Sequence, residues 1–433
     1  MKNKLSNKAF KTLLAIFVVL IPFQTRWIFH DWKLGGQIWE YGRVSIYLSM
    51  AILLLAAIFF LLANKKEVYF SKDRYLYFLF IYSLFIGFIS PIPAVSFYYL
   101  AIIYLAALFA YLIKFLPKYF VFKALLFSGS IQAAIAMWQL LAQEVVASKW
   151  LGVATHLPET LGTSVVEVGG ERLLRAYGTL PHPNILGGFL FVAIFAGVYL
   201  WLDFYKRMDK KGWHSAFGKK NIVEFFLIIF GLVISSFGLL ASFSRSALLA
   251  LSLSLFSLLL INIFRRKWLI VNVVIKYAIV FLLVAMCFNI IWPDSWGTRL
   301  RAEGRLEEQS ITERVDTLDQ LGWNDYQTAF LGQGLGMNTY KLYQAAPDKP
   351  IYNNQPIHDI FILLLAEVGV IGAFLLFNVV RLIIKSANQV DIMSTSLILG
   401  LIVIGFFDHY LWTSWTGWLL AAVGLVNLYK HKD

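Results

Sequence analysis

The chain has 433 residues, of which 59% are hydrophobic and 15% are charged, and its mean hydropathy is +0.68. Soluble domains contain about 45–50% apolar and about 25% charged residues, so this composition excludes a water-soluble globular protein. The net charge of +13 fits either nucleic-acid binding or the basic cytoplasmic loops of a membrane protein. The single cysteine, Cys287, lies in an apolar run and excludes an intramolecular disulfide.

Twelve apolar runs follow one another along the chain, and a bilayer-spanning helix needs about 20 such residues. The runs are Ala9–Phe23, Val44–Ala63, Tyr75–Ile89, Ser96–Ile113, Phe120–Ala142, Ile185–Leu202, Ile222–Ala241, Ala247–Phe264, Ile270–Ile291, Asp359–Val380, Ile392–Phe407 and Trp412–Leu428. A basic leader precedes the first run, but no cleavage site of small residues follows it, so we expect a retained first helix. The sequence therefore predicts an all-α polytopic membrane protein with about 12 transmembrane helices, forming a single membrane domain over residues 1–433.

The distribution of basic residues predicts the orientation of these helices. If both termini are cytoplasmic, the inner loops hold 24 Lys and Arg residues and the outer loops hold 13. Because basic residues are enriched in cytoplasmic loops, we expect both termini inside. The same bias explains the net charge and argues against a nucleic-acid partner.

Two outer segments, residues 143–183 and 292–357, are longer than ordinary connections, which rarely exceed about 12–15 residues. In the second, Ser310 and Glu313 form a capping box before apolar residues that recur on one helical face. This pattern predicts an amphipathic helix near residues 311–321, at the outer membrane surface or above a cavity.

Two arginines on the outer side are candidates for anion binding. Arg175 begins a segment with two prolines around His182 that leads into the sixth run, and Arg245 lies in the tight turn between the seventh and eighth runs. Arg175 is interpretable as a snorkelling side chain beside a proline-rich helix cap. Arg245 is interpretable as a ligand of helix carbonyls or lipid phosphate, or as a binder of an anionic substrate. The residues alone leave these alternatives open.

His358 and Glu367 lie near and within the tenth run. Nine residues correspond to about 900° of helical rotation, so the two side chains should point in opposite directions and should not form a dyad. A lone histidine is most often structural, but its position beside a polar loop favours a function. For Glu367 we expect a role in helix packing rather than acid catalysis.

The glycine-rich stretch at Gly332, Gly334 and Gly336 follows no predicted strand, which disfavours a nucleotide site. It fits better a backbone that approaches a ligand or the membrane closely. The outer loops contain no Asp-x-Asp, no His-x-x-x-His and no cysteine pair. We therefore expect no metal and no other cofactor.

Taken in order, these motifs resemble the O-antigen ligase and polymerase family. The set comprises Arg175, Gly178, Thr179, Pro183 and Asn184, then Ser244 and Arg245, then Glu313 and Arg314, then Gly332, Gly334 and Gly336, and finally His358, Glu367, Gly369 and Gly372. One departure is Asp359, where the family more often has asparagine after the histidine. Asp408 and His409 are also similar to a feature of some relatives.

The resemblance implies a GT-C-like membrane glycosyltransferase of lipopolysaccharide biosynthesis. Such an enzyme moves a glycan from an undecaprenyl (polyprenyl) diphosphate carrier to a hydroxyl of a glycan or glycolipid acceptor, on the outer face of the bacterial cytoplasmic membrane. By the same resemblance His358 is catalytic, Arg175 and Arg245 bind the diphosphate, and Arg314, Glu367 and Asp408 are possible supporting residues. The physical chemistry agrees, because arginine binds phosphate oxygens through two parallel hydrogen bonds and can stabilise a leaving diphosphate without a metal.

Several alternatives remain open at the level of the sequence. A polymerase of the same family and a protein O-oligosaccharyltransferase share these residues. A transporter of lipid-linked glycans would need polar residues along a path through the membrane, whereas the runs contain few charges beyond Lys276 and Glu367. Peptidoglycan polymerases fit the order of Arg175, Arg245 and His358 less well.

Overall fold

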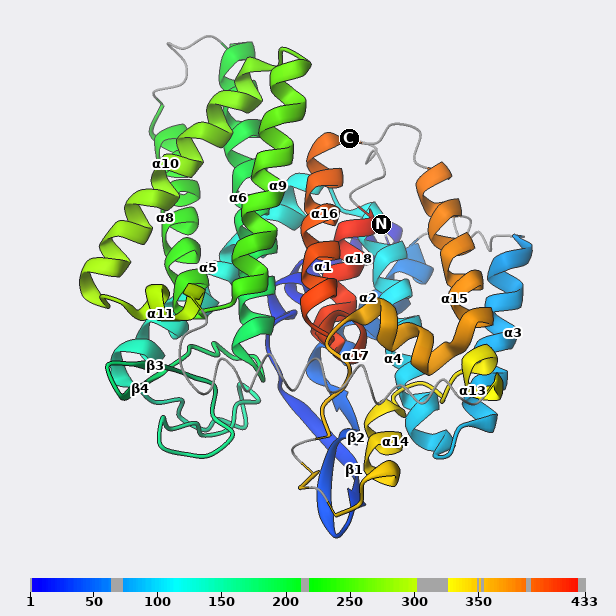
Figure 1. The fold of residues 1–433 in the computed structure, drawn as a ribbon. Helices are drawn as coiled ribbons and strands as arrows, with labels where there is room; N and C mark the ends of the chain where they lie inside the picture. The colour runs from blue at the N-terminus through cyan, green and yellow to red at the C-terminus, as the bar shows by residue number, and fades with distance from the viewer. Residues whose placement is uncertain are drawn as a thin grey trace.

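The computed structural model describes residues 2–63, 73–211, 218–301, 326–348, 350–351, 354–386 and 391–426. Helices dominate this part of the chain (Figure 1). The longer ones are α1 (Lys2–Leu20), α2 (Leu48–Ala63), α3 (Arg74–Ile89), α4 (Pro93–Leu112), α5 (Lys118–Ala142), α6 (Pro183–Lys211), α8 (Lys219–Ala241), α9 (Arg245–Phe264), α10 (Trp268–Ile291), α15 (Ile360–Ser386), α16 (Ile392–Phe407) and α18 (Trp415–Val426).

Seven helices within the described ranges are long and apolar enough to cross a membrane. They are Pro93–Phe115, Lys118–Ala142, Pro183–Asp209, Lys220–Ala241, Arg245–Phe264, Trp268–Ile291 and Ile360–Ser386. The class of a polytopic helical membrane protein is therefore confirmed, whereas the number of 12 spans remains a prediction. The remaining apolar runs coincide with α1 and with the shorter apolar helices α2, α3, α16 and α18.

Two small antiparallel sheets depart from the expectation of an all-α chain. Strands β1 (Arg26–Leu34) and β2 (Gln37–Tyr47) form a hairpin, and β3 (Val165–Val168) pairs with β4 (Glu171–Leu174). The first hairpin turns at Gly35 and Gly36, which both have positive φ (54° and 81°), as a tight two-residue turn requires. The start of the second apolar run, at Val44, is consequently strand rather than helix.

Helix α6 forms the centre of the membrane core, since 94% of its apolar span is buried inside the protein. It packs against α5, α8 and α9. Close approach depends on glycine: a Cβ added at Gly188 would lie 1.7 Å from the hydroxyl of Tyr410, in the short helix α17 (Tyr410–Thr413). The first turn of α6 is thereby brought against the segment that joins α16 and α18.

Helix α15 is broken at Gly369 (φ 63°, ψ −179°), so the tenth run is not one straight span. The backbone that the break exposes bonds to the glycine-rich stretch: Gln333 N–H donates to the Ala366 carbonyl (2.8 Å) and Gly334 N–H to the Glu367 carbonyl (3.0 Å). A Cβ at Gly332 would lie 2.3 Å from the carbonyl oxygen of Glu367. Gly332 therefore permits a close approach of the glycine-rich stretch to the backbone of α15, and an approach to a ligand or to the membrane stays a prediction.

The connections predicted to lie outside gather at one end of the helices, the lower end in Figure 1. They carry both hairpins and the short helices α11 (Ser295–Arg301), α13 (Tyr326–Leu331), α14 (Asn338–Ala345) and α17. The amphipathic helix expected near 311–321, with Arg314, lies outside the described residues.

Candidate active site

A cavity of about 300 Å³ opens at this end of the helices, which is the end predicted to lie outside. Five groups of residues contribute to its lining: the β1–β2 hairpin, the N-terminal half of α4, the start of α6, the segment before α15 and the segment between α16 and α18. Its lining includes Arg26, Glu40, Tyr41, Arg43, Tyr47, Tyr98, Tyr99, His182, Asn184, Gln355, His358, Asp408, His409 and Tyr410. A shallower hollow of about 430 Å³, between β4 and the α10–α11 connection, contains none of the candidate residues.

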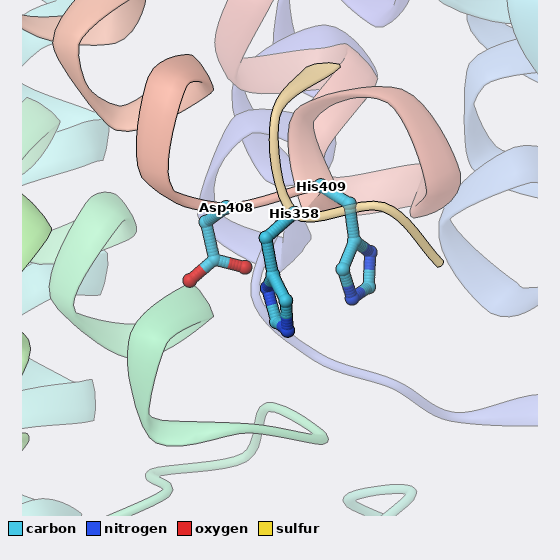
Figure 2. A group of neighbouring side chains, drawn as sticks. All are labelled: His358, Asp408 and His409. Atoms are coloured by element: carbon cyan, nitrogen blue, oxygen red, sulfur yellow. The ribbon is translucent and has the colours of Figure 1, made fainter. Parts of the chain in front are cut away.

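His358, Asp408 and His409 form a compact group on one side of this cavity (Figure 2). His358 lies just before α15, and the other two residues lie between α16 and α17. One ligand atom from each residue lies within 4.8 Å of the others, and the two imidazole rings have their centroids 5.2 Å apart. Two imidazoles and a carboxylate are suitable ligands for a divalent transition metal, so this group is the candidate metal site. Sequence motifs missed it because its members lie 50 residues apart.

The neighbour of His358 has a structural role. The Asp359 carboxylate accepts hydrogen bonds from the backbone N–H groups of Phe361 (2.8 Å) and Ile362 (3.1 Å). It therefore caps the first turn of α15, a role that asparagine performs equally well. Asp359, which replaces the asparagine of the family pattern, does not line the cavity.

Arg175 connects to the same group through one intermediate side chain. Its Nε donates to the Ser242 carbonyl (3.0 Å), and its Nη2 donates to Asn184 Oδ1 (2.5 Å). Asn184 Nδ2 in turn donates to Asp408 Oδ2 (2.5 Å). Arg175 is only 5% exposed and does not itself line the cavity, so its immediate contact with the site runs through Asn184 and Asp408.

The segment between Arg175 and α6 is fixed by two glutamines of α5. Gln139 accepts from the backbone of Tyr177 and Gly178 and donates to the Gly178 carbonyl, while Gln132 accepts from Thr179 N–H (2.8 Å). Gly178 has a positive φ of 61°, and a Cβ there would lie 2.5 Å from Gln132 Oε1. These buried amide contacts hold the start of α6 in register with the cavity.

His182 is held as a neutral ring. Its Nδ1 accepts the backbone N–H of Asn184 (3.1 Å), which places the ring proton on Nε2, 3.0 Å from the Ser164 hydroxyl. Desolvation lowers the pKa of His182 well below its usual range, and the neighbouring basic side chains of Arg175, His409, His358 and Arg299 add to this effect. His182 therefore lies among basic side chains from its own segment and from three distant parts of the chain.

Arg245 is paired with Arg299 of α11 through backbone carbonyls. Arg245 Nη1 lies 3.4 Å from the Arg299 carbonyl, and Arg299 Nε donates to the Phe243 carbonyl (3.2 Å). These two hydrogen bonds join α11 to the turn between α8 and α9. Arg299 was not among the residues singled out from the sequence, because nothing in the pattern distinguishes it from the other arginines of its loop.

The structure brings some of the predicted residues together and separates others. Arg175, His358 and Asp408 meet around the cavity, and Arg245 lies in the turn whose Ser242 carbonyl binds Arg175. Glu367 lies elsewhere: it is 2% exposed, accepts a hydrogen bond from Trp412 Nε1 (2.8 Å) and is not part of the cavity lining.

Comparison with known proteins bears on one part of the chain. Residues 230–377, from α8 into α15, match the family model described as O-Antigen ligase. The match includes Arg245, Arg299 and His358, and it confirms the resemblance inferred from the sequence. No curated protein matches the chain.

Proposed function

Because residues 230–377 carry an O-antigen ligase domain, we propose that this membrane protein is a glycosyltransferase whose donor is a glycan on a polyprenyl diphosphate carrier. The acceptor is a hydroxyl group of a glycan or glycolipid. The reaction takes place on the outer face of the bacterial cytoplasmic membrane.

The convergence of basic groups around His182 carries this proposal. Arg175, Arg299, His358 and His409 all act on its imidazole, and a cavity lies directly beside them. The two arginines of this set are permanently charged, and guanidinium groups close to a cavity are suited to a ligand with several negative charges, such as a diphosphate. The position of the cluster at the outer ends of the membrane helices fits a ligand that is anchored in the bilayer.

In the proposed reaction the oxygen of the acceptor hydroxyl forms a bond to the anomeric carbon of the donor sugar. The bond from that carbon to the diphosphate oxygen breaks, and its electron pair leaves with the diphosphate. A ring nitrogen of His358 accepts the hydroxyl proton, and Asp408 and His409 position the ring. Arg175, Arg245 and Arg299 stabilise the charge that develops on the leaving oxygens.

Arg175 and Arg245 fit this role in different ways. Arg175 is fixed by Ser242 and Asn184, so its contribution is a preorganised positive charge next to Asp408 and His358. Arg245 is partly exposed at the outer turn, where it can meet the diphosphate directly. Arg314 stays a candidate from the resemblance alone.

The proposed function requires one orientation of the protein in the membrane, with the cavity outside and both termini in the cytoplasm. In a Cys287→Ser background, a membrane-impermeant maleimide added to intact spheroplasts should label Leu161→Cys, which is exposed in the segment before β3. It should not label Lys267→Cys, in the turn between α9 and α10, until the membrane is broken. The reverse pattern would overturn the proposal.

The activity itself is testable with the purified protein in nanodiscs. Undecaprenyl diphosphate-linked glycans extracted from the source organism serve as donor, and its own glycolipids serve as acceptor. We expect release of undecaprenyl diphosphate together with a glycosylated acceptor. Lengthening of the carrier-bound glycan instead would assign a polymerase, and movement of the intact donor across the membrane without transfer would assign a transporter.

A further inference from the structure

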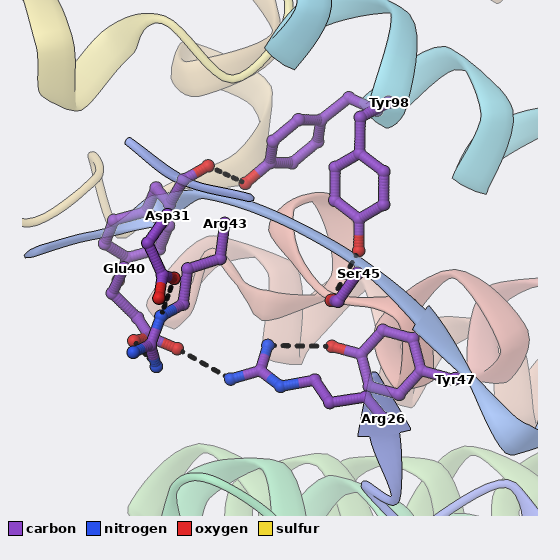
Figure 3. Close-up of polar contacts among 9 residues, drawn as sticks. Arg26, Asp31, Glu40, Arg43, Ser45, Tyr47 and Tyr98 are labelled. Atoms are coloured by element: carbon purple, nitrogen blue, oxygen red, sulfur yellow. Dashed lines mark hydrogen bonds and ion pairs between the residues drawn. The ribbon is translucent and has the colours of Figure 1, made fainter. Parts of the chain in front are cut away.

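The β1–β2 hairpin forms one wall of the cavity. Its side chains differ in chemistry from those of the basic group, by which we mean Arg175, Arg299, His358 and His409 around His182. Arg26 Nη2 contacts Glu40 Oε1 (3.1 Å), Arg43 Nη1 contacts Glu40 Oε2 (2.8 Å) and Arg43 Nε contacts Asp31 Oδ1 (2.8 Å). Figure 3 shows these side chains as a chain of alternating charges on the hairpin. The network of two arginines and two carboxylates has no net formal charge, and Arg26, Glu40 and Arg43 are its members that line the cavity, so this wall offers both fixed donors and a fixed acceptor.

Tyrosines surround this network. Arg26 Nη1 lies 3.4 Å from the Tyr47 hydroxyl, Tyr98 and Ser45 share a hydrogen bond of 3.1 Å, and the Tyr99 hydroxyl donates to the Tyr41 carbonyl (3.3 Å) (Figure 3). Tyrosine combines an apolar ring with a polar tip. The wall therefore presents flat apolar surface beside rigid polar groups, which matches the alternating C–H faces and hydroxyl edges of a sugar ring.

The carboxylates decide against a second phosphate site on this wall. Glu40 bridges both arginines, yet its side chain is 59% exposed, and it lines the cavity. An approaching phosphate would meet this negative charge, whereas a sugar hydroxyl can donate to Glu40 and accept from Arg43. An uncharged, hydroxyl-rich ligand is the class that such a surface favours.

The size and the position of the cavity limit the ligand further. About 300 Å³ is the lower end of the range for small-molecule pockets, which runs from about 300 to about 1,000 Å³. The cavity thus suits one sugar rather than an oligosaccharide. On its other side lie His358 and Asp408, next to the basic group, so a sugar here has its anomeric carbon near the site of the diphosphate.

The opposite face of the hairpin points away from the cavity and is apolar. Trp27 and Phe29 stack with centroids 5.0 Å apart and are 72% and 53% exposed. The hairpin joins α1 to α2, so these rings stand close to the outer ends of two membrane helices, where aromatic side chains favour the interface between lipid and water. The hairpin thus has one polar face that lines the cavity and one exposed apolar face that suits contact with lipid.

Resting on the proposed function, we propose that the cavity face of the β1–β2 hairpin, with Glu40 and Arg43 as its main polar groups, is a binding subsite for the uncharged sugar attached to the carrier diphosphate. The hairpin recognises the sugar, and the basic group recognises the diphosphate. The family match begins at residue 230 and does not include the hairpin.

Two probes separate the two halves of the ligand: bare undecaprenyl diphosphate, and the source organism's own undecaprenyl diphosphate-linked glycan. Binding of each to the full-length protein in nanodiscs gives an affinity ratio that measures the sugar's contribution. We expect wild-type protein to bind the glycosylated carrier at least tenfold more tightly than the bare one. Glu40→Gln and Arg43→Lys should each remove most of that advantage and leave the affinity for the bare carrier unchanged, since a hydrogen bond to a charged group accounts for about tenfold or more.

Glu159→Gln is the matched control, because Glu159 is an exposed acid of the outer segment that does not line the cavity. Its affinity ratio should equal that of the wild type, and the melting temperatures of all variants show that they fold. Equal wild-type binding of the two carriers, or an unchanged ratio in both hairpin variants, would overturn the subsite. So would equal weakening of both carriers. Failure of the bare carrier to bind wild-type protein would instead overturn the proposed diphosphate site.

Discussion

The two walls of the outer cavity use arginine in opposite ways. On the hairpin, Arg26 and Arg43 are held by the carboxylates of Glu40 and Asp31. On the other side, Arg175 and Arg299 are held by backbone carbonyls and by the amide oxygen of Asn184. A carboxylate that binds a guanidinium adds a negatively charged acceptor, which repels a phosphate but accepts a hydrogen bond from a sugar hydroxyl. We therefore expect the hairpin wall to bind hydroxyl groups and the wall of Arg175 and Arg299 to bind phosphate.

His358 lies between the two walls, so its removal should have the largest effect on transfer. General-base assistance accounts for about 10²–10⁴ in rate, and we expect His358→Ala to lose this factor while keeping its affinity for bare undecaprenyl diphosphate. Transfer and carrier binding are measured separately on the same nanodisc preparation. His30→Ala, an exposed histidine of β1 outside the cavity lining, serves as control and should keep full activity. Near wild-type transfer by His358→Ala, or equal losses of transfer and binding, would return His358 to a structural role.

The second-largest effect should come from substitutions of arginine, which should weaken binding of the bare carrier on the basic wall but not on the hairpin wall. Arg175→Lys and Arg245→Lys keep the charge but lose the planar fork. In Arg245 the fork can meet the diphosphate, and in Arg175 it binds Ser242 and Asn184 and so fixes the position of the charge. We therefore expect each substitution to weaken binding of the bare carrier about tenfold and to reduce transfer accordingly. Arg43→Lys on the hairpin should leave that affinity unchanged. Arg266→Lys, in the exposed inner turn between α9 and α10, controls for the substitution itself. Full activity of both Arg175→Lys and Arg245→Lys would assign these two residues to the structure alone.

The helical part of this architecture was predictable because long apolar runs have few alternatives in a membrane. The β1–β2 hairpin was not predicted, although the sequence contained its signal: alternating aromatic and polar residues on both sides of Gly35 and Gly36. The break in α15 was also missed. Gly369 marks the position of the break. The break is stable only because the glycine-rich stretch donates hydrogen bonds to the carbonyl groups that it exposes.

Prediction of the site divides in the same way. Arg175, Arg245 and His358 were recognisable from their order along the chain, but the contacts that join them depend on tertiary structure. Asn184 reaches Asp408 across 224 residues, and no local pattern encodes such a pair. The charge of the hairpin wall was equally hidden, because the pairing of Asp31 with Arg43 follows from the strand register.

Glu367 tests whether a buried carboxylate outside both walls affects the chemistry. Trp412 Nε1 and the backbone N–H groups of Gly336 and Asn338 donate to it, so the side chain fastens α15 to the glycine-rich stretch and to α17. In Glu367→Gln an amide N–H₂ faces one of these donors, and we expect a loss of stability of about 1–3 kcal/mol. Thermal unfolding should show this loss, while the rate of transfer by the folded fraction changes little. A large loss of transfer at unchanged stability would place Glu367 in the reaction.

The smallest expected effect is that of chelation. The basic wall supplies fixed positive charge where many glycosyltransferases use a divalent ion, so transfer by the purified protein should persist in EDTA. The structure makes this test sharper than the sequence did, because His358, Asp408 and His409 form a group with the ligand types of a metal site. If chelation abolishes transfer and Zn²⁺, Mn²⁺ or Mg²⁺ restores it, His409→Ala should weaken the restoring ion at least tenfold. In that case a bound ion, and not His358 as a free base, would activate the acceptor hydroxyl. The site would then consist of the hairpin wall, the basic wall and a metal ion between them.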